Sequence, residues 1–530
     1  MRNFELPTRS SVVATEAMAA TSHPSATVVA IQVLAAGGNA LDAAIAASAV
    51  QCVVEPNSTG IGGDCFALLS KEGSSDVIAY NGSGRTPAAL TVDWAIERGI
   101  TKLERQSPMS VTVPGAIDAW TRLHADHGRT PMAELLAPAI QLAEGGYAIS
   151  PRVHRDWVLE EKLLSSNPTA RRIFLPKGRA PHIGEIHRQP ELAATLRNIA
   201  MHGRDGFYTG SVAEDIVTCL QALGGLHTLD DFASARGEYV TTIKSNFRGH
   251  EVHECPPNGQ GVIALMILNI LARFKAKGDP LSADRLHIEI EATRLAHAAR
   301  DSLLADPDKV FVPVADLLSD AVADHLAGSI DLKRAIDNLP SLPPSLHRDT
   351  VYICVVDKDR NAVSFINSVF HGFGSGLVAP RSGVLLHNRG QDFSLDRKHP
   401  NVIAPGKRPM HTIIPGMVVK NGKTEMPFGV MGGYYQALGH AAFLSKVLDY
   451  GLDLQEAIDL PRVMPNFSTT EVEVEQTLSQ STAVELGRRG FRIIPAVDPI
   501  GGAQAIRIDW GNGTLLGGSE SRKDGCALGL

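Results

Sequence analysis

Residues 349–370 read DTVYICVVDKDRNAVSFINSVF, and this stretch decides the fold class. Its first part, TVYICVVD, has the composition of a buried strand, DKDRN is polar like a turn, and AVSFINSVF returns as a second strand. Two apolar strands joined by a short polar turn predict an antiparallel pair. We therefore expect a β-hairpin that begins at Thr350.

The segment directly before this hairpin, residues 340–349, predicts an exposed loop. Pro340, Pro343 and Pro344 interrupt any helix, and the following SLHRD is polar. Thr350 thus stands where a loop meets a strand. By itself this placement indicates no function, because a β-branched residue is simply favoured in a strand.

Helical patterns dominate most of the chain upstream of that loop. Residues 24–54 hold two Ala-rich stretches separated by Gly37-Gly38-Asn39, which suits the end of one helix and the start of the next. A strand hairpin is expected within residues 64–80. From about residue 108 to 345 the 3.6-residue period prevails, and the predicted helices are 114–127, 132–144, 190–202, 211–223, 262–275 and 282–303.

Strand patterns return after the hairpin at Thr350. A second hairpin is predicted within residues 417–428, helices at 434–450 and 482–489, and closing strands at 503–509 and 514–517. Strands and helices are thus segregated along the chain. The predicted fold class is α+β, a layered sandwich in which the last third of the chain supplies central strands.

Composition excludes several classes of protein. With 530 residues, 44% apolar and 20% charged, the chain is neither one small domain nor disordered. Its 50 Lys and Arg against 57 Asp and Glu give a net charge of −7 without a basic block, so nucleic acid is not expected as a partner. No secretory apolar segment begins the chain, and the longest apolar stretch, 262–274, falls short of the roughly 20 residues of a membrane span. We expect a soluble, cytoplasmic protein with no membrane partner.

Metal and cofactor motifs are missing from the sequence. The six cysteines form no CxxC pair and the 19 histidines no HExxH, so His253, His371 and His411 are interpreted as structural or surface residues, with no metal or cofactor expected. GIGGD at residues 60–64 lacks the spacing of a phosphate-binding loop, and CPPNGQG at 255–261 has the composition of a turn. There is no GxSxG elbow either, so a conventional serine hydrolase is not indicated.

An ordered series of segments, however, resembles one known family. The segments are HPSATVVAIQVLAAGGNALDAAIAASAV, VVEPNSTGIGGDCF, VTVPGAIDAW, PAIQLAEGGYAISP, GFYTG, GGLHTLDDF, DTVYICVVDKDRNAVSF, FGSG, GKRP and MGG. Together they span nearly the whole chain and are similar to the γ-glutamyltransferase (γ-glutamyl transpeptidase) family of N-terminal-nucleophile (Ntn) hydrolases. The segments PPNGQG, HNRGQDFSLD and APGKRPMHT look like a divergent branch that includes oxamate amidohydrolase and cephalosporin-acylase-like members.

The resemblance implies a proenzyme with a four-layer αββα fold. It would cut itself between Asp349 and Thr350, leaving a large subunit of residues 1–349 and a small one of 350–530 that together build one body. The hydroxyl of Thr350 would then be the nucleophile, and its new terminal amine the general base. By the same resemblance, Ser368 hydrogen-bonds the nucleophile and the N–H groups of Gly432 and Gly433 hold the oxyanion.

The chain departs from the family pattern in the groups that recognise substrate. The paired serines after KRP are replaced by His411 and Thr412, and the family's carboxylate-binding Arg falls near Ser83, with Arg85 displaced by two residues. We nevertheless keep Arg85, His411 and Thr412 as candidate substrate-binding residues.

The positions that bind the substrate amine in the family also differ. They align with Phe370, Arg389 and Asp392, of which only Asp392 keeps the family's residue type. Phe370 accepts no hydrogen bond and Arg389 repels an ammonium, whereas Arg389 can bind a carboxylate. The resemblance with these departures therefore implies Arg389 and Asp392 as binding residues, and an amide of a small carboxylate-bearing acid, oxamate-like or glutaryl-like, as substrate.

The preferred function is thus a self-processing amidohydrolase that works through an acyl-enzyme. One alternative is glutathione hydrolase or γ-glutamyl transpeptidase activity proper. A second is an uncleaved, catalytically silent homologue that acts as a binding protein. The expected partners are the small-molecule substrate and the two subunits of one precursor, with a homodimer of processed heterodimers as a further possibility.

Overall fold

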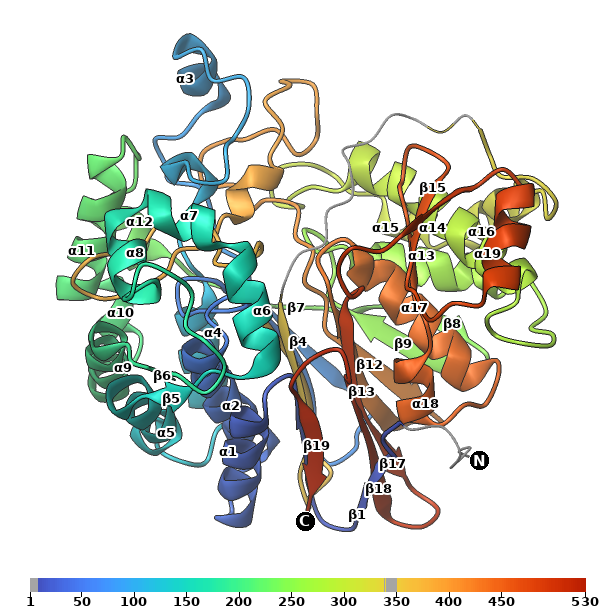
Figure 1. Ribbon diagram of the computed structural model, residues 1–530, viewed down its shortest axis with the longest axis horizontal. Coiled ribbons are helices and arrows are strands. Elements are labelled where there is room, and N and C mark those ends of the chain that lie inside the picture. Colours follow the sequence, from blue (N-terminus) through green and yellow to red (C-terminus); the bar gives the residue numbers. More distant parts are fainter. Residues whose placement is uncertain (1–7, 338, 340–349) are drawn as a thin grey trace.

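The computed structural model describes residues 8–337, 339 and 350–530 of the chain. The predicted loop at 340–349, with Asp349, lies outside the described residues. Within them the chain forms two large β-sheets that face one another, with a layer of helices on the outer side of each (Figure 1). The predicted α+β class and the αββα layering are confirmed.

The first sheet contains the hairpin that begins after Thr350. Its strands, in spatial order, are β19 (Cys526–Gly529), β2 (Met18–Thr21), β10 (Val351–Val356), β11 (Ala362–Ser368), β3 (Asp64–Ser70), β4 (Val77–Gly82) and β7 (Glu238–Val240). Strands β10 and β11 pair antiparallel and occupy the middle of this sheet. The hairpin predicted from two apolar strands and a polar turn is therefore correct.

The second sheet is also seven-stranded. Its order is β1 (Val12–Ala14), β18 (Thr514–Ser519), β17 (Gly502–Asp509), β13 (Lys423–Met431), β12 (Gly416–Lys420), β9 (His250–Glu254) and β8 (Ile243–Phe247). The last third of the chain supplies its central strands, as predicted.

The two sheets pack through alternate residues of their strands. In β10, Tyr352 and Cys354 belong to the apolar cluster between the sheets, while Ile353 and Val355 belong to the cluster beneath the helices. Both faces of this strand are consequently buried, which explains its nearly continuous apolar sequence. From the opposite sheet, Met417 joins the cluster between the sheets.

Helices cover the outer faces. The first sheet is covered by α1 (Pro24–Ala35) and α2 (Ala40–Val54), with α4 (Ala116–His127) and α5 (Met132–Gly145) beside them (Figure 1). The second is covered by α13 (Gly261–Leu271) and α17 (Tyr435–Leu448), against which α14 (Ala283–Leu303) packs. Between α1 and α2, Gly37 has a positive φ, and Asn39 and Asp42 cap α2 reciprocally. This is the break predicted from Gly37-Gly38-Asn39.

Shorter elements complete the described chain. The remaining helices are α3 (Val92–Glu97), α6 (Pro151–Leu159), α7 (Glu161–Ser166), α8 (Pro168–Phe174), α9 (Pro190–His202), α10 (Asp205–Tyr208), α11 (Gly210–Ala222), α12 (Leu229–Ser234), α15 (Val314–Leu317), α16 (Asp320–Gly328), α18 (Leu454–Asp459) and α19 (Gln480–Arg488), with the 3₁₀ turns η1 (Pro108–Ser110) and η2 (Arg389–Asp392). Strands β14 (Val463–Pro465), β15 (Glu471–Val474) and β16 (Arg492–Pro495) form a small sheet, and β5 (Tyr147–Ala148) pairs with β6 (Ile186–His187).

The helical prediction for residues 108–345 is wrong over one part. All six predicted helices are present, but β7, β8 and β9 lie within this region. Strands β7 and β8 stand at sheet edges, and their exposed positions carry Glu238, Tyr239, Lys244 and Asn246. A strand with one face in water and little apolar content gives a weak sequence signal.

Helix length and hydropathy bear on the question of membranes. Among the described residues, no helix is both long enough and apolar enough to cross a bilayer.

Candidate active site

The hydroxyls of Thr350 and Ser368 meet at the end of the central hairpin. The antiparallel register that pairs Val351 with Asn367 places these two residues side by side, with their Oγ atoms 3.2 Å apart. Both are buried: Thr350 is 1% exposed and Ser368 is fully enclosed. Strand pairing alone thus brings the predicted nucleophile to the predicted second hydroxyl.

Two further donors reach the same serine. The backbone N–H of Phe370 donates to Ser368 Oγ at 2.9 Å, and Arg389 Nη2 approaches that atom at 3.3 Å. Phe370 has a φ of 81°, a backbone conformation that is uncommon for a bulky residue and is concentrated at functional sites. The Ser368 hydroxyl accepts both bonds, so its own proton is available for a neighbouring oxygen such as that of Thr350.

Arg389 is the charged group nearest to this hydroxyl pair. It is fully buried at the start of η2, its Nη1 donates to Thr412 Oγ1 at 2.7 Å, and its guanidinium lies 3.9 Å from the centre of the Phe370 ring. The structure therefore brings together four residues that the sequence analysis selected separately: Thr350, Ser368, Arg389 and Thr412.

His411 faces a different partner. Its Nε2 donates to Asp64 Oδ2 at 3.0 Å, and its Nδ1 accepts from the N–H of Ile413 at 3.4 Å. Burial lowers the pKa of His411 to about 3, and the charge of Arg389 acts in the same direction. The ring is therefore neutral at ordinary pH, with both nitrogens engaged by protein groups.

Asp64 is a buried carboxylate beneath the site. It accepts hydrogen bonds from the backbone N–H groups of Gly84 and Gly115, in addition to the one from His411. Burial alone would raise the pKa of Asp64, but the neighbouring His387, His411 and Arg389 outweigh it and lower the pKa to about 2. An ionised Asp64 consequently supplies negative charge near the buried Arg389 cation.

The turn at Gly432 and Gly433 connects strand β13 to helix α17. Both glycines have positive φ, 123° and 60°. The side-chain nitrogen of Gln260 donates to the carbonyl of Gly433 at 3.0 Å and to that of Thr412 at 2.8 Å. A continuous set of hydrogen bonds thus runs from the glycine turn through Gln260 and Thr412 to Arg389 and Ser368.

Asp392 lies at the other end of η2 and contacts an aromatic residue. Tyr434 donates its hydroxyl proton to Asp392 Oδ1 at 2.7 Å, and the Tyr434 ring meets the Phe370 ring edge to face, with centres 6.5 Å apart. Asp392, Tyr434 and Arg300 line an open cavity of about 620 Å³. This cavity is the space on the Asp392 side of the candidate site.

Arg85 stands apart from these residues. Its guanidinium forms ion pairs with Asp306 at 3.2 Å and Asp308 at 2.7 Å. It lines a cavity of about 350 Å³ in whose described walls Thr350, Ser368 and Arg389 take no part. The structure therefore does not gather Arg85 with the hydroxyl pair.

Sequence reasoning missed three residues of this neighbourhood: Asp64, Gln260 and Tyr434. Asp64 and Gln260 belong to the segments GIGGD and CPPNGQG, whose composition predicts no functional residue. A carboxylate placed directly before the apolar strand CFALL was an available signal, because a buried acid requires dedicated partners. The role of Gln260 had no such signal, since its acceptors lie more than 150 positions away.

The described residues contain no group of three or more His, Cys, Asp or Glu side chains suited to hold a metal ion. The chemistry that the cluster itself offers is that of an alcohol nucleophile. A buried hydroxyl beside a second hydroxyl and a fixed cation, linked through Gln260 and Thr412 to a glycine turn, can serve acyl transfer.

Comparison with known proteins gives a consistent result. A family model described as Gamma-glutamyltranspeptidase matches residues 26–530. The chain is 37% identical to the "Glutathione hydrolase-like YwrD proenzyme" of Bacillus subtilis and 35% identical to the "Oxamate amidohydrolase proenzyme" of Klebsiella pneumoniae, in each case over 98% of this chain and 99% of the relative. The crystal structure of cephalosporin acylase from Bacillus halodurans superposes with a TM-score of 0.93 at 39% identity, covering 100% of this chain and 99% of that one.

Proposed function

The chain belongs to the gamma-glutamyltranspeptidase family, and from that premise we propose that it is a self-processing amidohydrolase with Thr350 as its nucleophile. Two of its relatives are named as proenzymes, which supports processing of one precursor into a large and a small subunit. The observation that carries the proposal is the buried contact between the hydroxyls of Thr350 and Ser368.

Processing would occur at the bond between Asp349 and Thr350. Thr350 Oγ attacks the carbonyl carbon of Asp349, the peptide nitrogen leaves as an amine, and an ester joins the two parts. Water then hydrolyses the ester, which restores the hydroxyl and leaves Asp349 with a terminal carboxylate. Thr350 thereby gains a free α-amine, with a reference pKa of about 8, that can act as general base.

The mature site would use this amine to take the hydroxyl proton of Thr350 during attack on a substrate amide. The N–H groups of Gly432 and Gly433 would stabilise the tetrahedral oxyanion, a type of contact worth about 2.7–4 kcal/mol per donor. Collapse of the intermediate expels the amine product and leaves an acyl ester on Thr350. A water molecule, activated by the same α-amine, then releases the acid.

The acyl group is proposed to carry a carboxylate and no α-amine, as oxamate and glutaryl amides do. Arg389 is buried beside Ser368 and stacks on Phe370, so it offers a desolvated cation near the reacting atoms. Such a cation repels an ammonium and attracts a carboxylate. Removal from water strengthens both effects.

γ-Glutamyl hydrolysis remains the second candidate, because Asp392 keeps the family's residue type and lies in the neighbourhood of Phe370 through Tyr434. A panel of glutaryl, oxamyl and γ-glutamyl amides distinguishes the two. Faster turnover of the γ-glutamyl substrate would exclude the acyl preference proposed here.

Denaturing electrophoresis and N-terminal sequencing test the processing step. Two polypeptides, one of which begins TVYIC, are expected after maturation. A single full-length chain that persists and turns over no amide would support the silent binding homologue instead.

The reducing cytoplasm is the proposed compartment, since all six cysteines are unpaired.

A further inference from the structure

The segment Ile500–Ala503 lies directly behind the glycine turn. A Cβ atom added to Gly432 would stand 2.9 Å from Gly501 Cα, and one added to Gly501 would stand 2.6 Å from the carbonyl oxygen of Met431. Backbone meets backbone here with no side chain between. A displacement of Ile500–Ala503 must therefore displace the turn at Gly432 and Gly433.

Three charged side chains hold this segment by its backbone atoms. Glu475 Oε1 accepts from the N–H of Ile500 at 3.1 Å, and Arg462 Nη1 donates to the carbonyl of Ile500 at 2.7 Å. Glu520 Oε2 accepts from the N–H of Ala503 at 2.7 Å. The segment is thus fixed at both of its ends.

Arg522 joins these three into one cluster, which we call the Arg/Glu lattice: Arg462, Glu475, Glu520 and Arg522. Arg522 donates to Glu475 at 2.6 and 2.7 Å and to Glu520 at 2.8 Å. Arg462 donates to Glu520 at 2.6 Å. Two positive and two negative charges therefore balance within one hydrogen-bonded group.

The lattice is deeply buried. The Glu520 side chain is fully enclosed, and those of Arg462, Glu475 and Arg522 are between 9% and 13% exposed. Burial would raise the pKa of Glu520, but the charges of Arg462 and Arg522 outweigh it and lower the pKa to about 2. Glu520 accordingly remains ionised throughout the physiological range.

Stability alone is a poor explanation for such a cluster. Buried ion pairs lose much of their Coulomb energy to desolvation, and apolar replacements are often as stable. The lattice instead directs three hydrogen bonds to the backbone of a segment of four residues. This pattern indicates that the lattice fixes the position of the backbone of Ile500–Ala503.

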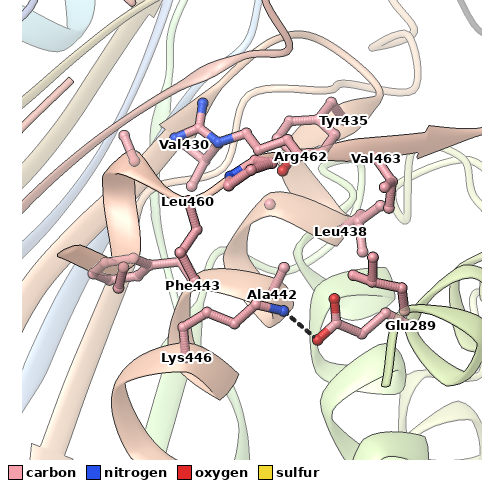
Figure 2. A pocket seen from close by; sticks show the side chains of 15 residues that line it. Glu289, Val430, Tyr435, Leu438, Ala442, Phe443, Lys446, Leu460, Arg462 and Val463 are labelled. Carbon is pink, nitrogen blue, oxygen red and sulfur yellow. Dashed lines mark hydrogen bonds and ion pairs between the residues drawn. The ribbon is translucent and has the colours of Figure 1, made fainter. Parts of the chain in front are cut away.

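Tyr435 forms a second connection between the segment Ile500–Ala503 and the turn. Figure 2 shows Arg462 and Tyr435 at the same end of a small cavity of about 30 Å³, away from the Glu289–Lys446 ion pair. The Tyr435 ring lies 2.7 Å from the position that a Cβ atom added to Gly501 would take. The backbone N–H of Tyr435 donates to the carbonyl of Gly432 at 3.1 Å. The segment Ile500–Ala503, the ring and the turn are therefore packed as one unit.

We infer that the Arg/Glu lattice is a positioning device for the N–H groups of Gly432 and Gly433. The inference rests on the proposed function, in which these groups hold the oxyanion. An oxyanion donor stabilises the transition state only in the correct geometry, and a misplacement of about 1 Å can cost on the order of 100-fold in rate. Glu520, Glu475 and Arg462 act through the backbone of Ile500–Ala503 and do not touch substrate.

The first test replaces Glu520 by Gln, which removes the charge and keeps the shape. Kinetics are measured on fully processed protein only, with the fraction processed determined by electrophoresis. For E520Q we expect kcat and the single-turnover acylation rate to fall by about tenfold or more, with KM within about twofold of the parent, because the contact is made in the transition state.

Asp215 provides the matched control. It is likewise a buried carboxylate that accepts from backbone N–H groups, those of Arg381 and Ser382, and from an arginine side chain. It lies on α11, away from the glycine turn. D215N is expected to lower the melting temperature about as much as E520Q while kcat stays within about twofold of the parent.

Gly501→Ala tests the connection between Ile500–Ala503 and the glycine turn without changing a charge. It replaces E520Q as the test if that variant does not fold. The new methyl group meets the Met431 carbonyl and the Tyr435 ring, so the segment must shift against the turn, and kcat is again expected to fall about tenfold at nearly constant KM. Unchanged kcat in processed E520Q and G501A would overturn the inference. Failure of the proposed function itself gives a different result, since Thr350→Ala would then retain turnover.

Discussion

The guanidinium of Arg389 lies 3.9 Å from the centre of the Phe370 ring, fully buried at the end of the central hairpin. The resemblance described above aligns these two residues with positions that bind a substrate amine in the family. As a stacked pair they present a desolvated cation and an apolar face. On the proposed function, such a site would select acyl groups by their charge, and this preference can be measured.

Replacement of Arg389 by Gln tests that selection directly. We expect kcat/KM for glutaryl and oxamyl amides to fall roughly 10- to 100-fold, because a hydrogen bond to a charged group is worth about 1.5–3 kcal/mol. Arg381→Gln is the control, since this arginine is 66% exposed. Equal losses for charged and uncharged acyl groups would contradict carboxylate recognition by Arg389.

Replacement of Phe370 by Asn restores a polar side chain at the adjacent position. Asn tolerates the positive φ of 81° found there better than most residues do. We expect the ratio of γ-glutamyl to glutaryl turnover to rise in F370N and to rise further when R389Q is added. A ratio that stays constant across this series would show that the pair does not set the acyl preference.

Replacement of Thr350 by Ala should abolish both processing and amide turnover, since it removes the proposed nucleophile of both steps. Thr350→Ser keeps a hydroxyl and is expected to process and to retain measurable turnover. Electrophoresis follows the first property and release of an anilide chromophore the second. An active T350A protein would refute the proposed mechanism.

The pH dependence of kcat/KM reports the general base. A terminal amine acts only when deprotonated, so the rate should fall about tenfold per pH unit below its pKa, whose reference value is about 8. His411 and Asp64 contribute no further step between pH 5 and 9, because their pKa values are lowered to about 3 and about 2. If the rise of kcat/KM with pH disappears when His371 is replaced, the general base is His371 and not the terminal amine.

Stability should decrease as the pH falls below about 6.5, the reference pKa of histidine. Burial lowers the pKa of His23, His187 and His227 to about 4, so the unfolded chain takes up protons that the folded chain does not. As the pH falls from the reference pKa toward the lowered pKa of the folded state, each such residue lowers the free energy of unfolding by up to about 1.4 kcal/mol per pH unit.

Thermal melts between pH 7 and pH 5 measure this dependence. Phe in place of His187 should flatten the slope, because the ring contacts with Tyr147 and Trp157 persist while the titration is lost. His182→Phe, at an exposed histidine, should leave the slope unchanged. The same slope in both variants would argue against a proton-linked penalty from buried histidines.

Local patterns in the sequence were sufficient for the central layers of the fold. Strands β10 and β11 are recognisable as two apolar runs on either side of a polar turn, and helices α1 and α2 by their Ala-rich stretches around Gly37-Gly38-Asn39. The edge strand β8 is not predicted, since two of its five residues are exposed and its apolar signal is weak. The active-site cluster was predictable only in part.

Thr350 and Ser368 could be paired in advance because hairpin register is a local property. The contacts of Gln260 with Thr412 and Gly433, and of His411 with Asp64, join positions separated by more than 150 residues. Only the packing of the two sheets creates them. The separation of Arg85 from the cluster likewise follows from its ion pairs with Asp306 and Asp308, which no spacing in the sequence reveals.

The interleaved strand order has a consequence for the processed protein. Strand pairs β19–β2, β2–β10, β11–β3, β1–β18 and β12–β9 each join a strand from before residue 350 to one from after it. Once the proposed cut is made, neither fragment retains a complete sheet by itself. The two fragments should therefore stay associated and active on extensive dilution. On heating, both should melt in a single transition.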